Sequence, residues 1–306
     1  MHRMQYLKKR RIIPICLVLM LTTAMAAFPA AAETDWSENE WNYLDISMDV
    51  SNGIPEDAEG RLQMIRQRGK LTVATEPYFP PQEFIDREKI GQERFVGSDM
   101  ELARLIAERM GVTLEITPMA FSHVLSEVAD GKYDLAISAL AFTTGRASRL
   151  ELSKGYFYAE ETVSSGLLIR EADAEVIREI ADLAERDIVA QSDSLQETMA
   201  VENIPLYRQF RRVSAVDNVY SAVQSGLADA GIVDIESAGI YLAGHPESGL
   251  CLAENVTFLL QPQYRGDRVA AQKGEMQLIC FVNGVIDEVL ESGQYMAWYN
   301  QFAGQQ

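Results

Sequence analysis

Two charged residues each follow an expected strand, where each could bind one end of a small zwitterion. Arg146 follows the apolar run 135–138 by one short loop, and Asp234 follows the apolar run 230–233 directly. A guanidinium is a planar fork that matches a carboxylate, and a carboxylate pairs with an ammonium group. Each residue also has a plainer interpretation, Arg146 as a surface partner of Glu151 and Asp234 as the N-cap of a following helix.

Aromatic side chains are the next candidates for ligand contact. The loop at 75–81 reads Thr-Glu-Pro-Tyr-Phe-Pro-Pro, and its prolines favour a rigid, extended turn that presents Phe79 at low entropic cost. Phe121 stands just before a helical pattern. Most aromatic residues belong to a core, so the pattern by itself leaves both as candidates.

The chain that must position these residues alternates short apolar strands with amphipathic helices, a pattern typical of parallel sheets covered on both faces. The alternation is interrupted and begins afresh near residue 175, and the apolar runs 166–169 and 257–260 suggest chain crossings. We therefore expect two α/β lobes joined by a paired hinge near 159–163 and 262–266. Expected helices span 62–67, 98–110, 122–130, 175–184, 194–201, 217–225, 236–243, 275–290 and 294–302, and expected strands span 71–74, 114–117, 135–138, 188–190 and 230–233.

Two local rules refine this expectation. Ser98 followed by Glu101 fits a capping box at the start of the second helix. Ligands of such sheets bind beyond the carboxyl ends of the strands, so the loops that follow residues 74, 138, 190 and 233 should face one cleft.

Residues 1–32 have the pattern of a secretory signal peptide. Five basic residues precede Ile12, an apolar run extends to Phe28, and Ala30–Ala32 supplies small residues for cleavage. The alternative is an uncleaved membrane anchor. The residues before Cys16 do not fit a lipobox, so we expect a periplasmic or extracellular protein without a lipid anchor. Residues 33–59 then form an acidic leader that we expect to drape over the body.

Charge and composition exclude several classes of function. The chain has 306 residues with 27 Lys and Arg against 45 Asp and Glu, and the part after residue 32 carries −23. Such a body repels phosphate backbones, so nucleic-acid binding is not expected. His123 and His245 have no ligand-spaced neighbours, so neither a metal nor another cofactor is expected. Cys251 and Cys280 permit one disulfide, but free thiols are the preferred interpretation.

Several motifs, in this order and spacing, resemble the family 3 extracellular solute-binding proteins, the polar amino-acid receptors of ABC importers. The resemblance covers about 62–304. It rests on Arg68-Gly69-Lys70-Leu71-Thr72-Val73, Gly97-Ser98-Asp99-Met100-Glu101-Leu102-Ala103, Gly131-Lys132-Tyr133-Asp134-Leu135, Gly226-Leu227-Ala228-Asp229-Ala230 with Asp234, and Phe281-Val282-Asn283 through Ser292-Gly293-Gln294-Tyr295.

The resemblance implies a type II periplasmic-binding-protein-like fold, with one lobe from 60–162 plus 266–306 and the other from 163–265. It implies that Arg146 binds a ligand α-carboxylate and Asp234 its α-ammonium, with Phe79 and Phe121 at the aromatic positions around the ligand. The expected partners are an amino acid and an ABC-importer permease. The expected protein is a monomer that binds and closes without catalysis.

Departures from the family pattern bear on the ligand. Ala139 and Ala141 stand where such receptors usually have Ser, Thr or Gly, and the usual Gly-Thr turn is replaced around Asp193 and Ser194. A lost hydroxyl removes a hydrogen bond worth about 0.5 to 1.5 kcal/mol. Asp193 adds an anion near the expected ligand carboxylate. With Glu76, it suggests a ligand with a cationic or polar side chain.

Two rival functions remain open. Some proteins with this resemblance are cyclohexadienyl dehydratases, which eliminate water and carbon dioxide from prephenate or arogenate. That chemistry needs a proton donor in a dry cleft, for which Glu76 is the first candidate and Glu160 or Glu161 the next. The other rival is a ligand-sensing module.

Overall fold

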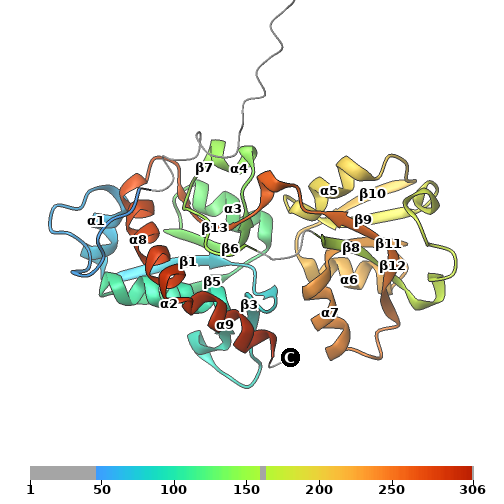
Figure 1. The fold of residues 1–306 in the computed structure, drawn as a ribbon, viewed down its shortest axis with the longest axis horizontal. Helices are drawn as coiled ribbons and strands as arrows, with labels where there is room; N and C mark the ends of the chain where they lie inside the picture. Colours follow the sequence, from blue (N-terminus) through green and yellow to red (C-terminus); the bar gives the residue numbers. More distant parts are fainter. Residues whose placement is uncertain (1–45, 159–162, 305–306) are drawn as a thin grey trace, which may run out of the picture. The chain divides into compact units, whose positions relative to one another are not determined.

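The computed structural model describes residues 46–158 and 163–304, which form two α/β lobes (Figure 1). Each lobe has a five-stranded sheet with helices on both faces, so the predicted fold class is confirmed. The predicted signal peptide, residues 33–45 of the leader and residues 159–162 of the first hinge segment lie outside the described residues. Glu160 and Glu161, two of the candidate proton donors, lie there too.

The first lobe is built on a sheet in which four of five strands run the same way. Strand β13, which arrives from the second lobe, is antiparallel and lies between β6 and β7. The strand order is β5 (Thr113–Pro118), β1 (Lys70–Thr75), β6 (Leu135–Ala141), β13 (Asp267–Gln272) and β7 (Leu150–Leu152). The helices are α1 (Gly60–Arg68), α2 (Ser98–Met110), α3 (Phe121–Ala129), α4 (Thr144–Arg149), α8 (Met276–Ser292) and α9 (Gln294–Ala303).

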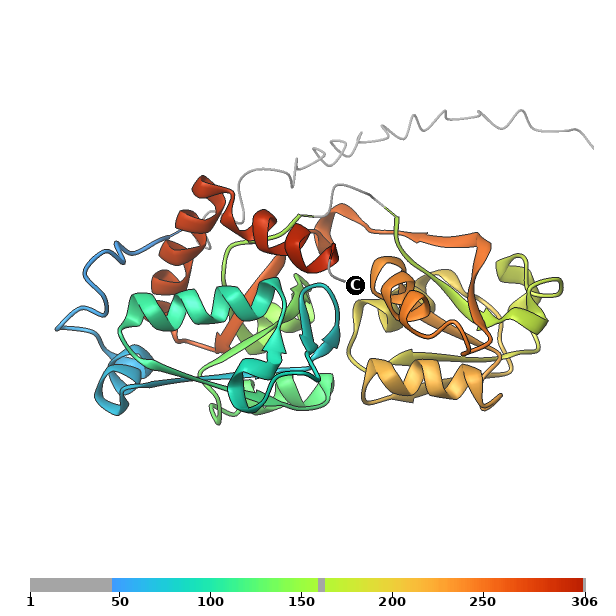
Figure 2. The same cartoon turned by 90° about the horizontal axis from the view of Figure 1, so that it is seen from below.

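The second lobe repeats the same plan. Strand β8 follows the first chain crossing and is the antiparallel member, paired with β11 on one side and β12 on the other. The strand order is β10 (Gln209–Val213), β9 (Asp187–Gln191), β11 (Ala230–Asp234), β8 (Val163–Arg170) and β12 (Leu250–Leu259). Helices α5 (Leu195–Asn203), α6 (Val216–Gln224) and α7 (Ile235–Gly244) cover it, and Figure 2 shows both sheets with their helices from below.

Alternation of side chains along the strands creates a core on each face of each sheet. In β1, Val73 packs with α1, α2 and α8, whereas its neighbour Ala74 packs with α3 on the opposite face. In β9, Ile188 packs with α5 and Val189 packs with α6. Both faces of each sheet are therefore buried, which explains why the strands are apolar runs without a polar side.

Smaller elements complete the first lobe. A three-stranded sheet of β2 (Tyr78–Phe79), β3 (Glu83–Ile85) and β4 (Phe95–Val96) follows β1, with the 3-10 turn η2 (Gly91–Arg94) before β4. Residues 46–59 have no helix or strand and pack against α8, where Met48 N–H donates to the Cys280 carbonyl at 2.9 Å.

The structure corrects four expectations. The capping box is wrong, because Ser98 is the first residue of α2 and its hydroxyl donates to Tyr295 instead. The expected helix 175–184 does not form: η3 (Glu171–Asp173) precedes this range, which contains only the 3-10 turn η4 (Ile180–Leu183). Most of the runs 166–169 and 257–260 lies within the second sheet, as β8 and β12, rather than between the lobes. Strands β10 and β13 were not expected, and the second hinge segment contains the 3-10 turn η5 (Pro262–Tyr264).

No helix in the described part of the chain combines the length and apolar character needed to cross a bilayer. Within the same residues, Cys251 and Cys280 are free thiols, one in the second sheet and the other in α8.

Candidate functional site

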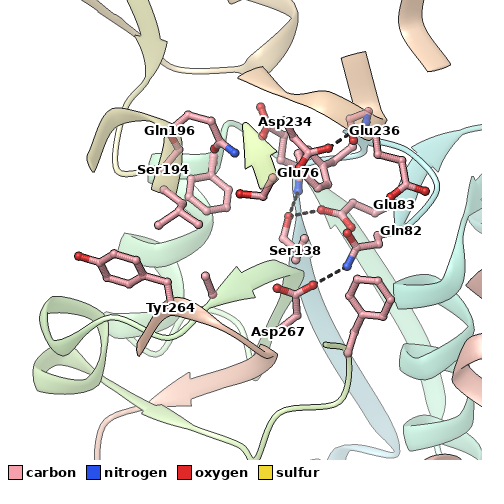
Figure 3. A pocket seen from close by; sticks show the side chains of 18 of the residues that line it. Glu76, Gln82, Glu83, Ser138, Ser194, Gln196, Asp234, Glu236, Tyr264 and Asp267 are labelled. Carbon is pink, nitrogen blue, oxygen red and sulfur yellow. Dashed lines mark hydrogen bonds between the residues drawn. The ribbon is translucent and has the colours of Figure 1, made fainter. Parts of the chain in front are cut away.

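Both lobes line one partly open cavity of about 130 Å³ at the carboxyl ends of β1, β6, β9 and β11 (Figure 3). The cavity therefore lies where strand order predicts a ligand. Eight residues selected from the sequence line it: Glu76, Phe79, Phe121, Ala139, Ala141, Arg146, Ser194 and Asp234. Asp193 does not, and lines a neighbouring hollow instead.

Arg146, in the middle of α4, enters the cavity from the first lobe with its side chain buried. Its Nη1 donates to the Ala141 carbonyl at 2.7 Å and its Nη2 to the Asp193 carbonyl at 3.0 Å. Its guanidinium carbon lies 5.3 Å from the centre of the Phe121 ring. Burial lowers the pKa of Arg146 to about 10, so the group stays charged at neutral pH. A guanidinium has five N–H donors, so three remain for an anion.

Asp234 faces the same cavity from the end of β11 and also caps α7, because its Oδ1 accepts the N–H of Ser237 at 2.9 Å. The same side chain therefore caps α7 and lines the cavity. Burial raises the pKa of Asp234 to about 6. A cation bound beside it would favour the ionised form.

Glu76 joins the two lobes rather than pointing freely into the cavity. Gln191 Nε2 donates to its Oε2 at 2.5 Å, and the N–H of Val216, at the start of α6, donates to its Oε1 at 3.1 Å. Both carboxylate oxygens are thus occupied by donors of the second lobe. Burial raises the pKa of Glu76 to about 7.

Three further contacts hold the lobes together across the cavity. Ser237 Oγ donates to the Pro80 carbonyl at 2.7 Å, the Tyr299 hydroxyl donates to Glu236, and Arg146 reaches the Asp193 carbonyl. The two lobes are therefore joined directly by hydrogen bonds between residues that line or border the cavity.

The sequence did not single out the acidic residues on the floor of the cavity. Asp267, the first residue of β13, accepts Gln82 Nε2 through its Oδ2 at 2.7 Å (Figure 3). Glu83 accepts Ser138 Oγ through Oε1 at 3.0 Å, and its buried Oε2 has no hydrogen-bond partner among the described residues. Asp267 lies between Gly266 and Arg268, just before the apolar run 269–271, but β13 itself was not expected.

Asp99, a fully buried residue of α2, stabilises the backbone of β6. It accepts the Ala139 N–H at 2.9 Å and the hydroxyls of Tyr156 and Tyr295 at 2.8 and 2.7 Å. Ala139 has a φ of 47°, in the left-handed region where glycine is favoured. The hydrogen bond from its N–H to a buried carboxylate helps to hold this unfavourable conformation.

Carboxyl groups outnumber cationic side chains in the lining of the cavity. Its lining includes five carboxyl groups and a single cationic side chain, Arg146; the carboxyl groups belong to Glu76, Glu83, Asp234, Glu236 and Asp267. Burial raises the pKa of Asp267 to about 7, and burial followed by repulsion from Asp99 raises the pKa of Glu83 well above its usual range. Within the described residues, no group of three or more His, Cys, Asp or Glu side chains is arranged to hold a metal ion.

Residues 71–305 match the model of the bacterial extracellular solute-binding proteins, family 3. The chain belongs to this family. Among solved family structures, the amino acid ABC transporter substrate-binding protein AbpA of Streptococcus pneumoniae, bound to L-arginine, is 31% identical with a TM-score of 0.68. The match covers 79% of this chain and 98% of that one.

Characterised relatives of this solute-binding protein include both receptors and an enzyme. The arginine-binding extracellular protein ArtP of Bacillus subtilis is 22% identical over 227 residues, 74% of this chain and 82% of ArtP. The cyclohexadienyl dehydratase of Pseudomonas aeruginosa is 26% identical over 191 residues, 62% of this chain and 68% of the enzyme.

Proposed function

We propose that this family 3 protein is an exported receptor that captures a small zwitterion, an amino acid, between its lobes and delivers it to an ABC-transporter permease. The observation that carries the proposal is that Arg146 of the first lobe and Asp234 of the second line the same cavity. The ligand carboxylate takes the free N–H groups of Arg146, and its ammonium group takes Asp234.

Binding both ends of one molecule couples recognition to closure. Arg146 and Asp234 belong to different lobes, so a ligand that contacts both stabilises the arrangement in which the lobes meet. The aromatic residues Phe79 and Phe121 line the cavity beside these charges. They would cover the apolar part of the ligand and exclude water.

Calorimetric titration with the amino acids that stabilise the protein in a thermal-shift panel tests this proposal. Arg146→Ala is expected to reduce affinity at least about 100-fold, because it removes a charge-assisted, buried partner of the carboxylate. Arg149→Ala is the matched control, since Arg149 is exposed on the same helix. Unchanged affinity in Arg146→Ala would refute the assigned role, and failure of every amino acid to bind would refute the receptor.

A second candidate function is a cyclohexadienyl dehydratase-like elimination, favoured by one specific observation. Glu76 is a buried carboxyl group in the cavity, and burial raises its pKa to about 7, the range in which a carboxylic acid can donate a proton near neutral pH. Incubation with prephenate or arogenate separates the two functions. Absorbance of phenylpyruvate formed from prephenate, absent in Glu76→Gln, would identify the enzyme.

A further inference from the structure

The carboxyl groups of the cavity outnumber the charges that a simple zwitterion can neutralise. If an amino acid occupies Arg146 and Asp234, its own two charges are used. Of the remaining acids, Glu76 has both oxygens engaged by lobe-to-lobe hydrogen bonds, and Glu236, which accepts the Tyr299 hydroxyl, is exposed to solvent. Asp267 and Glu83 are left facing the cavity, and Arg146, the cation that acts on Asp267, would already bind the ligand carboxylate.

The geometry of these two side chains leaves acceptors available. Gln82 occupies only Oδ2 of Asp267, and Oδ1 receives no donor from the described residues. Glu83 is 1% exposed, and its Oε2 likewise receives no donor within 46–158 and 163–304, although the carboxyl group lies beside that of Asp99. A buried carboxylate oxygen without a donor, as in Glu83, is unfavourable, and Asp267 is partly exposed with one oxygen able to accept, so these atoms are suited to a ligand that brings donors and positive charge.

We propose that the cavity is specific for an α-amino acid with a cationic side chain, and that Asp267, together with Glu83, binds that second positive charge. The inference rests on the proposed receptor function and names its ligand class. It reassigns the cation-binding role that the sequence suggested for Glu76 and Asp193, because Glu76 is committed to the second lobe and Asp193 lines another hollow. Asp267 is then the residue that determines specificity.

The protonation of Asp267 provides a second test, because it should make ligand binding depend on pH. The titratable or charged groups around Asp267 are Glu83, Asp99, Arg146, Tyr156, Asp234, Tyr295 and Tyr299. Only Arg146 among them is a cation, so burial and the neighbouring acids favour protonation of Asp267 in the ligand-free cavity. A bound cation favours the ionised form instead, so cation binding should release a proton and become tighter as pH rises to about 7.

The decisive experiment compares L-arginine with L-citrulline, its uncharged isostere, by calorimetry on the whole protein at pH 8. We expect arginine to bind about 100-fold more tightly. The ratio of the two affinities should shrink about 30-fold between pH 8 and pH 5.5, because Asp267 takes up a proton. The shared α-amino and α-carboxylate contacts cancel in this ratio, so Asp234 titration does not imitate the effect. Glu76 has the same pKa of about 7, and loss of the pH dependence in Asp267→Asn separates the two residues.

Variants assign the effect to residues. Asp267→Asn keeps the size of the side chain and should reduce the arginine-to-citrulline ratio to below about tenfold, with Glu83→Gln as a second variant. Asp57→Asn, at an exposed position of the leader, is the matched control and should leave the ratio unchanged. Circular dichroism establishes that each variant is folded, and the comparison of ligands on the unmodified protein does not depend on the variants.

Each outcome decides a different question. Equal affinity for citrulline and arginine overturns the cationic ligand class while leaving the receptor intact. A charge preference that survives in both Asp267→Asn and Glu83→Gln overturns the assignment to these residues. Absence of binding by all amino acids removes the proposed function itself and the inference with it.

Discussion

Replacing Glu76 by alanine is expected to weaken ligand binding by opening the cleft, although Glu76 would make no contact with the ligand's cation. The wild-type carboxylate accepts Gln191 Nε2 at 2.5 Å and the Val216 N–H at 3.1 Å, so it ties β1 of one lobe to β9 and α6 of the other. Alanine leaves both donors unpaired whenever the lobes meet. When the lobes separate, water can satisfy the same donors.

The loss of ligand affinity follows from the difference between unpaired donors in the closed arrangement and hydrated donors in the open one. A buried donor without a partner costs about 1 to 3 kcal/mol, and Gln191 and Val216 are both largely buried. Taking the lower value for each gives about 2 kcal/mol in favour of the open arrangement, which corresponds to about a 30-fold loss of affinity when binding requires closure. Part of this loss is offset because alanine also removes a carboxyl group that is costly to bury.

Glu76→Gln provides the sharper comparison. Its amide oxygen can keep the bond from Val216, and the Gln191 amide can turn to present its oxygen to the new NH₂ group. We therefore expect affinity within about threefold of the unmodified protein, because both lobe-to-lobe hydrogen bonds are retained. Glu108→Ala, at an exposed position of α2, controls for loss of a glutamate side chain.

Calorimetry gives the affinities, and small-angle scattering with and without ligand gives the change in dimensions on closure. Glu76→Ala should bind about 30-fold more weakly and should need more ligand to reach the compact form. An affinity within threefold of the unmodified protein for Glu76→Ala would show that these hydrogen bonds do not control closure. A large loss in Glu76→Gln with none in Glu108→Ala would instead indicate that the negative charge itself contacts the ligand.

Two further predictions concern stability. Burial raises the pKa of Glu76 and Asp267 to about 7 and of Asp234 to about 6, above their ordinary values, so the folded protein binds more protons than the unfolded chain between about pH 4 and 7. The melting temperature of the ligand-free protein should therefore fall as pH rises from 5 to 8, and a rise over this range would contradict the burial of these acids. Gly284→Ala should destabilise the protein by about 2 kcal/mol and release the 46–50 segment to proteolysis, because a Cβ there would lie 2.1 Å from the Met48 carbonyl oxygen. Gly239→Ala, which has open space around it, should not; equal behaviour of the two variants would argue against the packing of this segment on α8.

Much of the fold was predictable because strand and helix periodicities are local signals. The stripes of α2 and α8 and the apolar strands β1, β6, β9 and β11 are read from neighbouring residues, and all of them occur close to the expected bounds. The failures have non-local causes. At 175–184, where a helix was expected, few residues are buried and the only regular element is the 3-10 turn η4. At Ser98, a hydroxyl expected to cap a helix is taken by Tyr295, almost 200 residues away.

The residues of the candidate site likewise divide into those that a local pattern predicted and those whose position depends on distant partners. Arg146 and Asp234 follow strands of recognisable pattern, and both line the cavity. The orientation of Glu76 was not predictable, because its partners Gln191 and Val216 come from the other lobe. Asp193 was expected in the same cleft, yet only its backbone carbonyl reaches Arg146.

Two of the residues that were missed, Asp267 and Ser164, lie at positions that the rule about carboxyl ends does not cover. Strand β13 is antiparallel, so its first residue, Asp267, pairs with Ala141 at the carboxyl end of β6. In the second lobe β8 is likewise antiparallel, and Ser165 near its start pairs with Asp234 at the end of β11. Its neighbour Ser164 lines the cavity, with a hydroxyl that has no partner among the described residues. Because each antiparallel strand follows a chain crossing, the crossings deliver the amino ends of two strands to the cleft. The search for ligand contacts in a chain of this pattern should therefore include the first residues after each crossing.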